Sequence, residues 1–272
     1  LRVVAHYLGD DGFEDLVKSL YTSFYSDLKI VPASGKTITL TSQQLAAIKQ
    51  QPGVRDISLI AEEKALLKLK DGESQSVVYI KGVDSDFDKV SGVPYKLSKG
   101  KFNTGSVDTP LLIIGAGIQN ALAISINEAF APEYITVILP KKNVSGSDPL
   151  QSLSEGNATT SAVFAIQQDF DNKYVISNIG FVKQQMGLLE NEFTAAEIKS
   201  RAGADIEQEQ ASLQKLLGNK YKIQTKYQQN SNLYNTMRLE KWAIYGVLTL
   251  ILIIAAFNMV SALTMLVLEK KQ

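Results

Sequence analysis

The sequence predicts an α+β domain followed by one apolar α-helix that is long enough to cross a membrane. Two observations predict the domain: a strand, helix, strand pattern occurs twice, and a β-rich segment from about Thr109 to Gly180 lies between the two occurrences. The helix is predicted by 27 residues without a charge, from Trp242 to Leu268. Charged residues make up 21% of the chain, and nearly all of them precede this segment. The first 241 residues therefore have the composition of folded, water-soluble material with at least one hydrophobic core.

The apolar segment is longer than a bilayer requires. At about 1.5 Å of rise per residue it forms roughly 40 Å of helix, whereas the hydrocarbon core is about 30 Å thick. Trp242 and Tyr245 lie at its start, where amphipathic rings favour the membrane interface. The alternative is a buried core helix, but core helices rarely run this far without a charged face. The segment also exceeds the apolar core of a signal peptide. Two cations flank it on each side, so charge does not decide its orientation.

Composition excludes several classes of function. Lys and Arg together number 28, as do Asp and Glu, and no long basic run occurs, so nucleic acid is not an expected partner. The chain has no cysteine, which removes disulfides, thiolate catalysis and cysteine metal sites. The single histidine, His6, stands alone near the terminus, where a surface position without a catalytic role is expected.

The first half of the domain opens with residues 1–12, which fit no element and form an uncertain N-terminal end. An amphipathic helix is expected from Phe13 to Leu28, either in a soluble core or as a stalk leaving a membrane. The elements expected after it are two short strands broken at Pro32 to Gly35, a capping box at Thr41 before a helix from Leu45 to Gln50, a strand from Val54 to Ile60, and a hairpin that turns at Asp71-Gly72 and returns along Val77 to Val83. Residues 84–108 are expected to be loop-rich.

The second half continues with more strand patterns and one strong helix. The expected elements are a strand from Leu111 to Ile114, a turn at Gly115 to Gly117, a short helix from Ile118 to Ile124, a strand from Tyr134 to Leu139, strands Ser161 to Phe170 and Tyr174 to Ile179 paired around Asp171-Asn172, one or two helical turns from Phe181 to Leu189, a strand from Phe193 to Lys199, a helix from Asp205 to Leu217 and a strand from Tyr221 to Tyr227.

A polar loop is expected from Lys141 to Thr160, where Gly, Pro and Ser are frequent. It is the longest structureless stretch that the sequence predicts. Asp148, Pro149 and Leu150 make it a candidate partner-binding loop, and a merely flexible hairpin tip is the alternative.

No motif in the chain predicts catalysis or a cofactor. Gly115-Ala116-Gly117 follows a strand and opens a helix, but the third glycine of a dinucleotide fingerprint is replaced by Asn120. A phosphate-binding GxxxxGK[ST] loop is absent from the sequence, so we expect the chain to bind neither ATP nor NAD. The carboxylates of residues 62–63 and 84–88 have no histidine or clustered third ligand, which favours solvated loop charges over a metal site.

The apolar segment contains one stripe of small and polar residues. Asn258 lies three or four positions from Ala255, Ser261 and Ala262, so the four share one helix face. An unpaired amide in hydrocarbon is costly, and small residues allow close helix packing. We therefore expect these residues to contact another transmembrane helix.

With these elements in place, the chain resembles the FtsX-like, MacB-type ABC-transporter permeases, and most closely the lipoprotein-releasing (LolC/LolE) branch. The resemblance is strongest in the sequence LEKWAIYGVLTLILIIAAFNMVSALTMLVLEKKQ, with its EKW start, AAFN centre and EKK end. DLKI with Gly35-Lys36 resembles the first periplasmic strand, and LLIIGAGIQNALAI resembles the strand, turn and helix of the form IIGxGLAxxLG. At the N-terminus, where the family has a first transmembrane helix, this chain has LRVVAHYLGDDG instead.

The resemblance implies a division of the chain into parts. Residues 13–108 would hold a stalk helix and the first half of a porter-like part, 109–180 an inserted β-rich sabre-like part, 181–230 the second porter half, 231–241 a stalk and 242–268 a transmembrane helix. Residues 13–241 would be periplasmic, and the intact permease would be a multi-pass protein of the inner membrane. We expect residues 13–238 to be soluble without the apolar segment.

The resemblance also implies a function and partners. A separate cytoplasmic ABC ATPase would supply the energy, so this chain would not be an enzyme. A second permease subunit, identical or different, would complete the assembly in membrane lipid. The substrate would be a lipoprotein, and a periplasmic lipoprotein carrier is a further candidate partner. The alternatives are a MacB-like efflux permease, an FtsX-like regulator of cell-wall hydrolases, and an unrelated membrane-anchored binding domain.

Overall fold

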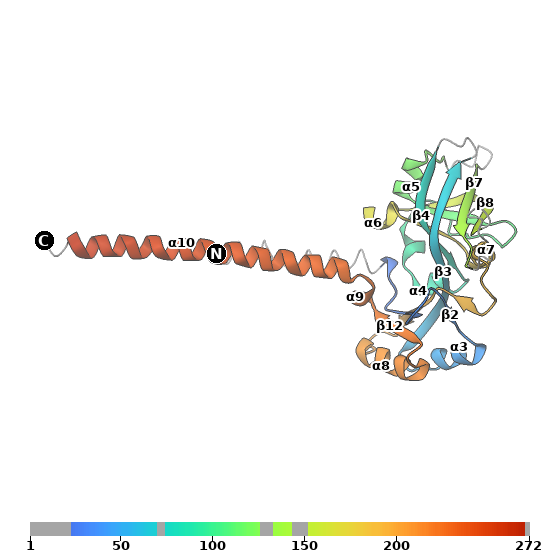
Figure 1. Ribbon diagram of the computed structural model, residues 1–272, viewed down its shortest axis with the longest axis horizontal. Coiled ribbons are helices and arrows are strands. Elements are labelled where there is room, and N and C mark those ends of the chain that lie inside the picture. The colour runs from blue at the N-terminus through green and yellow to red at the C-terminus, as the bar shows by residue number, and fades with distance from the viewer. Residues whose placement is uncertain (1–22, 70–73, 126–132, 143–151, 270–272) are drawn as a thin grey trace. The chain divides into compact units, whose positions relative to one another are not determined.

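The computed structural model describes residues 23–69, 74–125, 133–142 and 152–269, and it divides the chain into two compact units, Leu1–Lys226 and Tyr227–Gln272. The first unit is the mixed α/β domain whose elements are labelled in Figure 1. The elements follow one another as β1 (Leu28–Pro32), β2 (Ile38–Thr39), α3 (Ser42–Lys49), β3 (Val54–Leu69), β4 (Gln75–Val83), α4 (Phe87–Val90), the 3-10 helix η1 (Val93–Lys96), β5 (Leu97–Gly100), β6 (Leu111–Gly115), α5 (Ala116–Ala121), β7 (Tyr134–Pro140), β8 (Leu153–Phe164), α6 (Gln168–Asp171), β9 (Tyr174–Asn178), α7 (Ile179–Met186), β10 (Glu192–Phe193), β11 (Ala195–Ser200), α8 (Ile206–Leu217), β12 (Tyr221–Thr225), α9 (Lys226–Gln229) and α10 (Ser231–Glu269).

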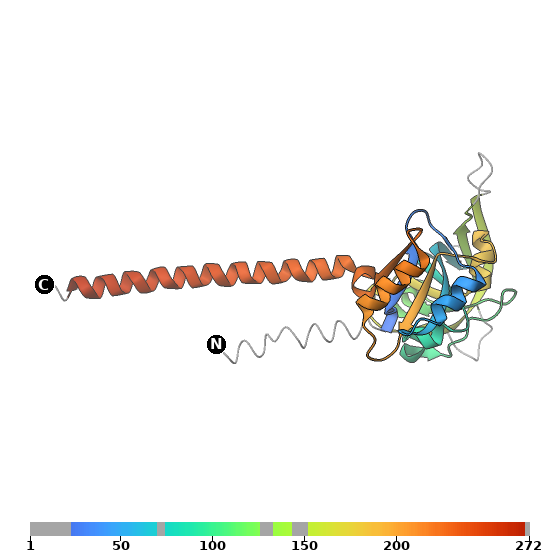
Figure 2. The same ribbon diagram turned by 90° about the horizontal axis from the view of Figure 1, so that it is seen from below.

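One end of the main sheet has the strand order β12-β1-β11-β3, with every neighbouring pair antiparallel. The helix α3 follows β1 along the chain and α8 follows β11, so two split strand, helix, strand units interlock in one sheet. Both helices cover the same face of these strands, as Figure 2 shows from below. Ile48 of α3 and Leu213 of α8 pack there against Leu28, Ile30 and the other buried apolar side chains of the four strands.

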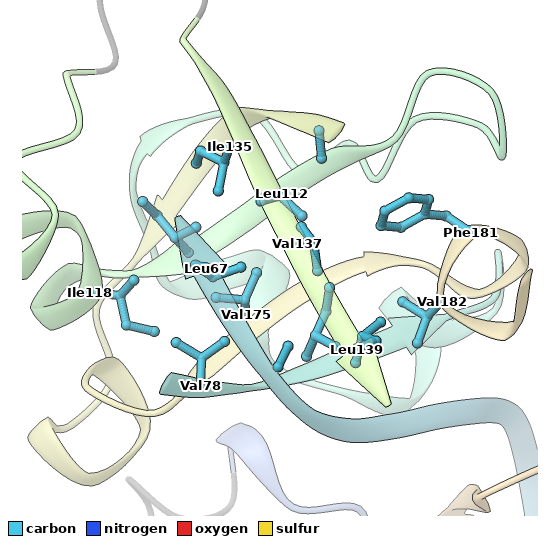
Figure 3. Close-up of a cluster of buried hydrophobic side chains, with 14 of the residues drawn as sticks. Leu67, Val78, Leu112, Ile118, Ile135, Val137, Leu139, Val175, Phe181 and Val182 are labelled. Atoms are coloured by element: carbon cyan, nitrogen blue, oxygen red, sulfur yellow. The ribbon is translucent and has the colours of Figure 1, made fainter. Parts of the chain in front are cut away.

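The other end of the sheet closes into a barrel. Around the ring, β3 pairs with β4, β4 with β9, β9 with β6, β6 with β8, β8 with β7, and β7 returns to β3. Figure 3 shows the apolar interior, with Leu67, Val137 and Val175 pointing inward from the strands. Ile118 of α5 and Phe181 of α7 complete the same cluster. A six-stranded ring is narrow enough for side chains to fill it, so the barrel has a packed core rather than a channel.

The strand β3 belongs to both ends of the sheet. It runs for 16 residues, pairing with β11 from Val54 to Ile60 and with β7 from Leu66 to Leu69 along the same edge. A single continuous strand therefore connects the four-stranded end with the barrel. The predicted boundaries of the inserted part, after residue 108 and at residue 180, stay a prediction. The closed ring also contains β3 and β4, which precede residue 108 in the sequence.

Several local expectations are confirmed. The Thr41 hydroxyl caps α3, and the Gln44 side chain bonds back to the Thr41 amide, which is the expected capping box. The two strands broken after Pro32, the helical turns from Ile179 and the helix ending before Gly218 are also present. Asp71 and Gly72 lie outside the described residues, but β3 and β4 form the antiparallel pair that their turn predicts.

Other expectations are wrong. The predicted loop from Lys141 to Thr160 is too long, because β8 begins at Leu153 and pairs with β7 and β6. The predicted hairpin around Asp171-Asn172 does not form. Instead the chain turns into α6, where the Asp171 carboxylate accepts a hydrogen bond from the Ile166 amide. The strand β9 then pairs with β4 and β6, which shows that tertiary pairing overrides the local alternation.

The GxG segment has a steric role. The expected separate turn is absent, because α5 begins at Ala116, directly after β6. A Cβ atom at Gly115 would overlap the backbone of Asp171, and one at Gly117 would overlap the side chain of Asn172. The glycines therefore allow α6 and its following turn to pack against the strand-to-helix junction.

The second unit contains α10, which is long and apolar enough to span a membrane from Trp242 to Met265, with a mean hydropathy of 2.3. None of this window is buried within the protein. The hydroxyls of Thr249, Ser261 and Thr264 each donate to the backbone carbonyl four residues earlier. Each of these hydroxyls is therefore satisfied within its own helix.

Glutamine side chains of α8 bond backbone groups along the outer edge of β12, the last strand of the sheet. Gln214 donates to the carbonyl oxygens of Gly218 and Tyr221 at 2.9 and 2.8 Å and accepts from the Ile223 amide at 3.3 Å, while Gln210 donates to the Ile223 carbonyl at 2.8 Å. Edge strands with open backbone groups can pair with other chains. These side chains occupy the groups that such pairing would use.

We predict that Gln214→Ala lowers the free energy of unfolding by about 1–3 kcal/mol, because three hydrogen bonds of about 1 kcal/mol each are lost. Urea unfolding in detergent micelles, followed by circular dichroism, measures the change. Gln208→Ala, at an exposed position of the same helix, is the matched control and should change stability by less than about 0.5 kcal/mol. Equal values for the two variants would contradict the role of Gln214.

Candidate functional site

The chain enters and leaves the four-stranded end of the sheet at the same place. β1 and β12 are antiparallel neighbours, with Leu28 opposite Thr225, so Asp27 before β1 lies beside Lys226 after β12. The Asp27 carboxylate contacts Lys226 Nζ at 2.9 Å and Lys199 Nζ at 3.0 Å, and it accepts from the Ser200 amide at 3.1 Å. We call these four residues the Asp27 clamp.

The clamp also uses the backbone, because the Lys226 amide donates to the Asp27 carbonyl at 3.1 Å. Burial raises the pKa of the Asp27 carboxyl, but the charges and hydrogen bonds of Lys226 and Lys199 outweigh it and hold the pKa below its ordinary value. A lowered pKa means that the clamp stabilises the fold at neutral pH. That stability is lost as the pH falls below 3.8 and through the lower pKa of the folded state.

A second set of charges is buried in the same sheet, on the face opposite α3 and α8. Lys81 of β4 and Glu197 of β11 are each 2% exposed at the side chain, and their charged atoms are 2.7 Å apart. Lys29 Nζ lies 3.8 Å from both Glu197 and Glu62. These four residues, the buried charge cluster, come from four neighbouring strands, β1, β11, β3 and β4.

Aromatic rings cover the buried charge cluster. Lys81 Nζ lies 4.9 Å from the Phe24 ring centroid and 5.3 Å from that of Phe87, which suits cation–π attraction on both sides. Phe24 in turn stacks on Phe170 at 4.3 Å and contacts Tyr174 at 4.5 Å. Phe24 and Asp27 lie in the same short segment before β1, so that segment is attached to both charge sites.

Burial and the neighbouring charges shift the pKa of Lys29, within the cluster, and that of Tyr174, beside it. Burial lowers the pKa of Lys29, but Glu62 and Glu197 outweigh it, so the net pKa is raised. The stabilisation from Lys29 is therefore present at neutral pH and is lost only as the pH rises through the raised pKa. Burial, with the nearby carboxylates, also raises the pKa of Tyr174, which keeps its hydroxyl neutral.

The arrangement is suited to holding segments together. Among the residues that the structure describes, no group of three His, Cys, Asp or Glu could hold a metal ion. Each carboxylate of the two sites lies near a lysine Nζ, at 2.9 Å for Asp27, 3.8 Å for Glu62 and 2.7 Å for Glu197. What the site can do is fix the incoming segment before β1 to the outgoing segment after β12.

The site residues predicted from the sequence lie elsewhere. Ala255, Asn258 and Ser261 are exposed on α10. The side-chain amide of Asn258 makes no hydrogen bond within the described part of the chain. Ala262 is on the same helix, but its side chain lies outside what the structure describes, as do Asp148, Pro149 and Leu150. Contact of the α10 stripe with another helix stays a prediction.

Sequence reasoning missed the two charge sites. A usable signal existed for Lys81 and Glu197, since Lys81 is the single charge in VVYIKGV and Glu197 stands between Ala196 and Ile198 in AAEIKS. No comparable signal marked Asp27 and Lys226, which are 199 positions apart in the sequence. Only the antiparallel pairing of β1 with β12 brings them together.

Comparisons with known proteins identify the fold. No family model matches the chain, and no curated protein matches its sequence. Among solved structures, the periplasmic region of MacB from Actinobacillus actinomycetemcomitans matches 82% of this chain and 98% of its own, with a TM-score of 0.53 and 12% identity. The extracellular domain of the noncanonic ABC-type transporter YknZ from Gram-positive bacteria matches 73% and 99%, with a TM-score of 0.47 and 11% identity. The fold is that of the MacB periplasmic region, and this assignment rests on the first match.

We predict that Glu197→Gln destabilises the domain by about 3–5 kcal/mol, because it leaves the Lys81 charge buried without its partner. Urea unfolding of the full chain in detergent micelles measures the loss. Replacing both partners by apolar residues, Lys81→Met with Glu197→Leu, should recover most of it. Glu207→Gln, exposed on α8, is the control. A loss below about 1 kcal/mol for Glu197→Gln would contradict a close ion pair.

Proposed function

We propose that this chain is a permease subunit of an ABC transporter of the MacB and FtsX-like class. Residues 13–241 would be its periplasmic part and α10 one of its membrane helices. The likeness to the MacB periplasmic region supports the domain assignment, and the length and hydropathy of α10 support the membrane helix. A separate ATPase subunit would supply the energy, so the chain itself would not hydrolyse ATP.

The single observation that carries the proposal is the Asp27 clamp. A permease must convert movement of membrane helices into a change of shape in the domain outside the membrane. Here the segment that precedes β1 and the segment that leads to α10 are joined at Asp27 and Lys226. Movement of either segment would act directly on adjacent strands of one sheet, rather than on a flexible linker.

The buried charge cluster and β3 extend this path. A shift of the segment before β1 would move Phe24 against Lys81, whose ion pair with Glu197 connects β4 with β11. The strand β3 then continues from the four-stranded end into the barrel. We propose that the four-stranded end is the porter-like part, that the barrel carries the sabre-like part, and that both move in response to the ATPase.

The finer proposal is lipoprotein release. It is supported by the EKW, AAFN and EKK sequences of α10, which resemble those of the LolC/LolE branch. The substrate would be a lipoprotein, the partners an ABC ATPase and a second permease subunit, and the location the inner membrane. The alternatives remain efflux of the MacB kind, control of cell-wall hydrolases, and a membrane-anchored binding domain.

Partner identity tests the proposed function. The intact permease, tagged and purified from its native membranes in mild detergent, should carry an ABC ATPase subunit in stoichiometric amount. Crosslinking from the periplasmic side should then capture a lipoprotein carrier. An efflux adaptor or a peptidoglycan hydrolase captured instead would replace lipoprotein release by one of the alternatives. Absence of any ATPase from the purified complex would contradict the transporter proposal itself.

A separate prediction concerns the stripe on α10. We predict that Asn258→Leu in the intact permease uncouples ATP hydrolysis from substrate release or weakens assembly, because an interhelical amide contact of about 0.6–2 kcal/mol is lost. Thr249→Val is the control, because the Thr249 hydroxyl donates to the Tyr245 carbonyl of its own helix. Release and ATPase activity are measured in reconstituted vesicles. Wild-type values of both for Asn258→Leu would show that the stripe makes no important contact.

A further inference from the structure

Glu209 is a buried carboxyl group next to the Asp27 clamp that the clamp itself does not use. It lies in the first turns of α8 and is 5% exposed. Within the described part of the chain, neither carboxyl oxygen makes a well-formed hydrogen bond; the neighbouring Ser200 hydroxyl interacts with the carboxyl group, but without good hydrogen-bond geometry. Buried polar atoms are nearly always paired, so this position needs an explanation.

The Glu209 carboxyl group packs against the chain just before β3. A Cβ atom added at Gly53 would lie 2.8 Å from the Glu209 Oε2, so the carboxyl group occupies the space beside this glycine. A pocket of about 420 Å³ adjoins the group and is lined by residues 51–53 and 201–205 and by the α8 side chains of Gln208, Glu209 and Ser212. Water in this pocket would allow protons to exchange with Glu209.

The charged groups around Glu209 are already engaged. Asp27, directly before β1, acts on Glu209 through its negative charge and is itself paired with Lys199 and Lys226. From the loops, Arg201 donates through Nε to the Val54 carbonyl at 3.0 Å, and Asp205 caps the first turn of α8. No cation among the described residues is therefore paired with Glu209.

A charge on Glu209 would be unfavourable in this environment. An ionised carboxylate without a partner is expensive to bury. Burial raises the pKa of Glu209 above its ordinary value, the negative charge of Asp27 raises it further, and the Ser200 hydroxyl lowers it only in part. The protonated, neutral form therefore fits the closed structure.

We propose that Glu209 is a proton-controlled switch of the Asp27 clamp: in its neutral form it leaves the clamp closed, and on ionisation its negative charge repels the Asp27 carboxylate, weakens the contacts of Asp27 with Lys199 and Lys226 and loosens the clamp. This regulatory role rests on the proposed function only in its consequence, since a loosened clamp would transmit less movement between membrane helix and domain. The clamp itself, and its response to protons, can be measured in the isolated chain.

The sign of the effect follows from linkage. Because the pKa of Glu209 is raised in the folded state, the group's contribution to stability is complete below pH 4.5 and is lost as the pH rises through the folded-state pKa. The Asp27 ion pairs show the opposite trend, because they are lost as the pH falls and the Asp27 carboxyl becomes protonated. A decline of the clamp with rising pH is therefore specific to Glu209.

Hydrogen–deuterium exchange of the full chain in detergent micelles tests the proposal. The reporters are peptides containing the Ser200 and Lys226 amides, both of which donate to Asp27. With intrinsic exchange rates normalised to an unfolded reference, their protection in the wild type should fall several-fold between about pH 4.5 and pH 8. In Glu209→Gln, a neutral side chain of the same shape, protection should stay at its low-pH level throughout.

One control variant and two contradicting outcomes make the experiment decisive. Glu207→Gln, on the exposed side of α8, should follow the wild type. A flat wild-type profile overturns the proposal without any variant, and so does an equal decline in Glu209→Gln. Either result would leave the transporter proposal intact, because that depends on the ATPase found in the purified permease. Conversely, absence of the ATPase would not alter the exchange profile.

Discussion

The structure depends on one pairing, that of β1 with β12. Because these strands are antiparallel neighbours, the point where the chain enters the sheet and the point where it leaves lie side by side. Asp27 and Lys226 convert this proximity into a direct ion pair, supported by Lys199 and by the Ser200 amide. A domain whose two ends are fixed together in this way can respond as one body to movement at either end.

The buried charge cluster is a costly way to connect strands. An apolar core of the same volume would often be at least as stable as a buried ion pair. What the pair of Lys81 and Glu197 adds is a specific register, because the lysine that lies beside Phe24 and Phe87 contacts the Glu197 carboxylate at 2.7 Å. We infer that this arrangement fixes how the segment before β1 sits on the sheet, which is the property that transmission of movement needs.

The two cores of the domain divide its tasks. Under α3 and α8, Leu28 and Leu213 belong to an apolar layer that supports the strands of the clamp. In the barrel, Leu67 and Val137 belong to a closed and separately packed interior. The strand β3 is the covalent link between them. A change imposed on the four-stranded end would reach the barrel through this strand.

The sequence by itself determined the features that depend on neighbouring residues. These are the capping box at Thr41, the helix that begins after Asp205, the β3–β4 hairpin and the apolar length of α10. The tertiary structure alone decided the closed barrel, the conversion of residues 168–171 to a helix and the pairing of Asp27 with Lys226. The physical reason is distance along the chain: periodicity and capping report contacts a few residues apart, whereas a sheet register joins residues that only the complete fold brings together.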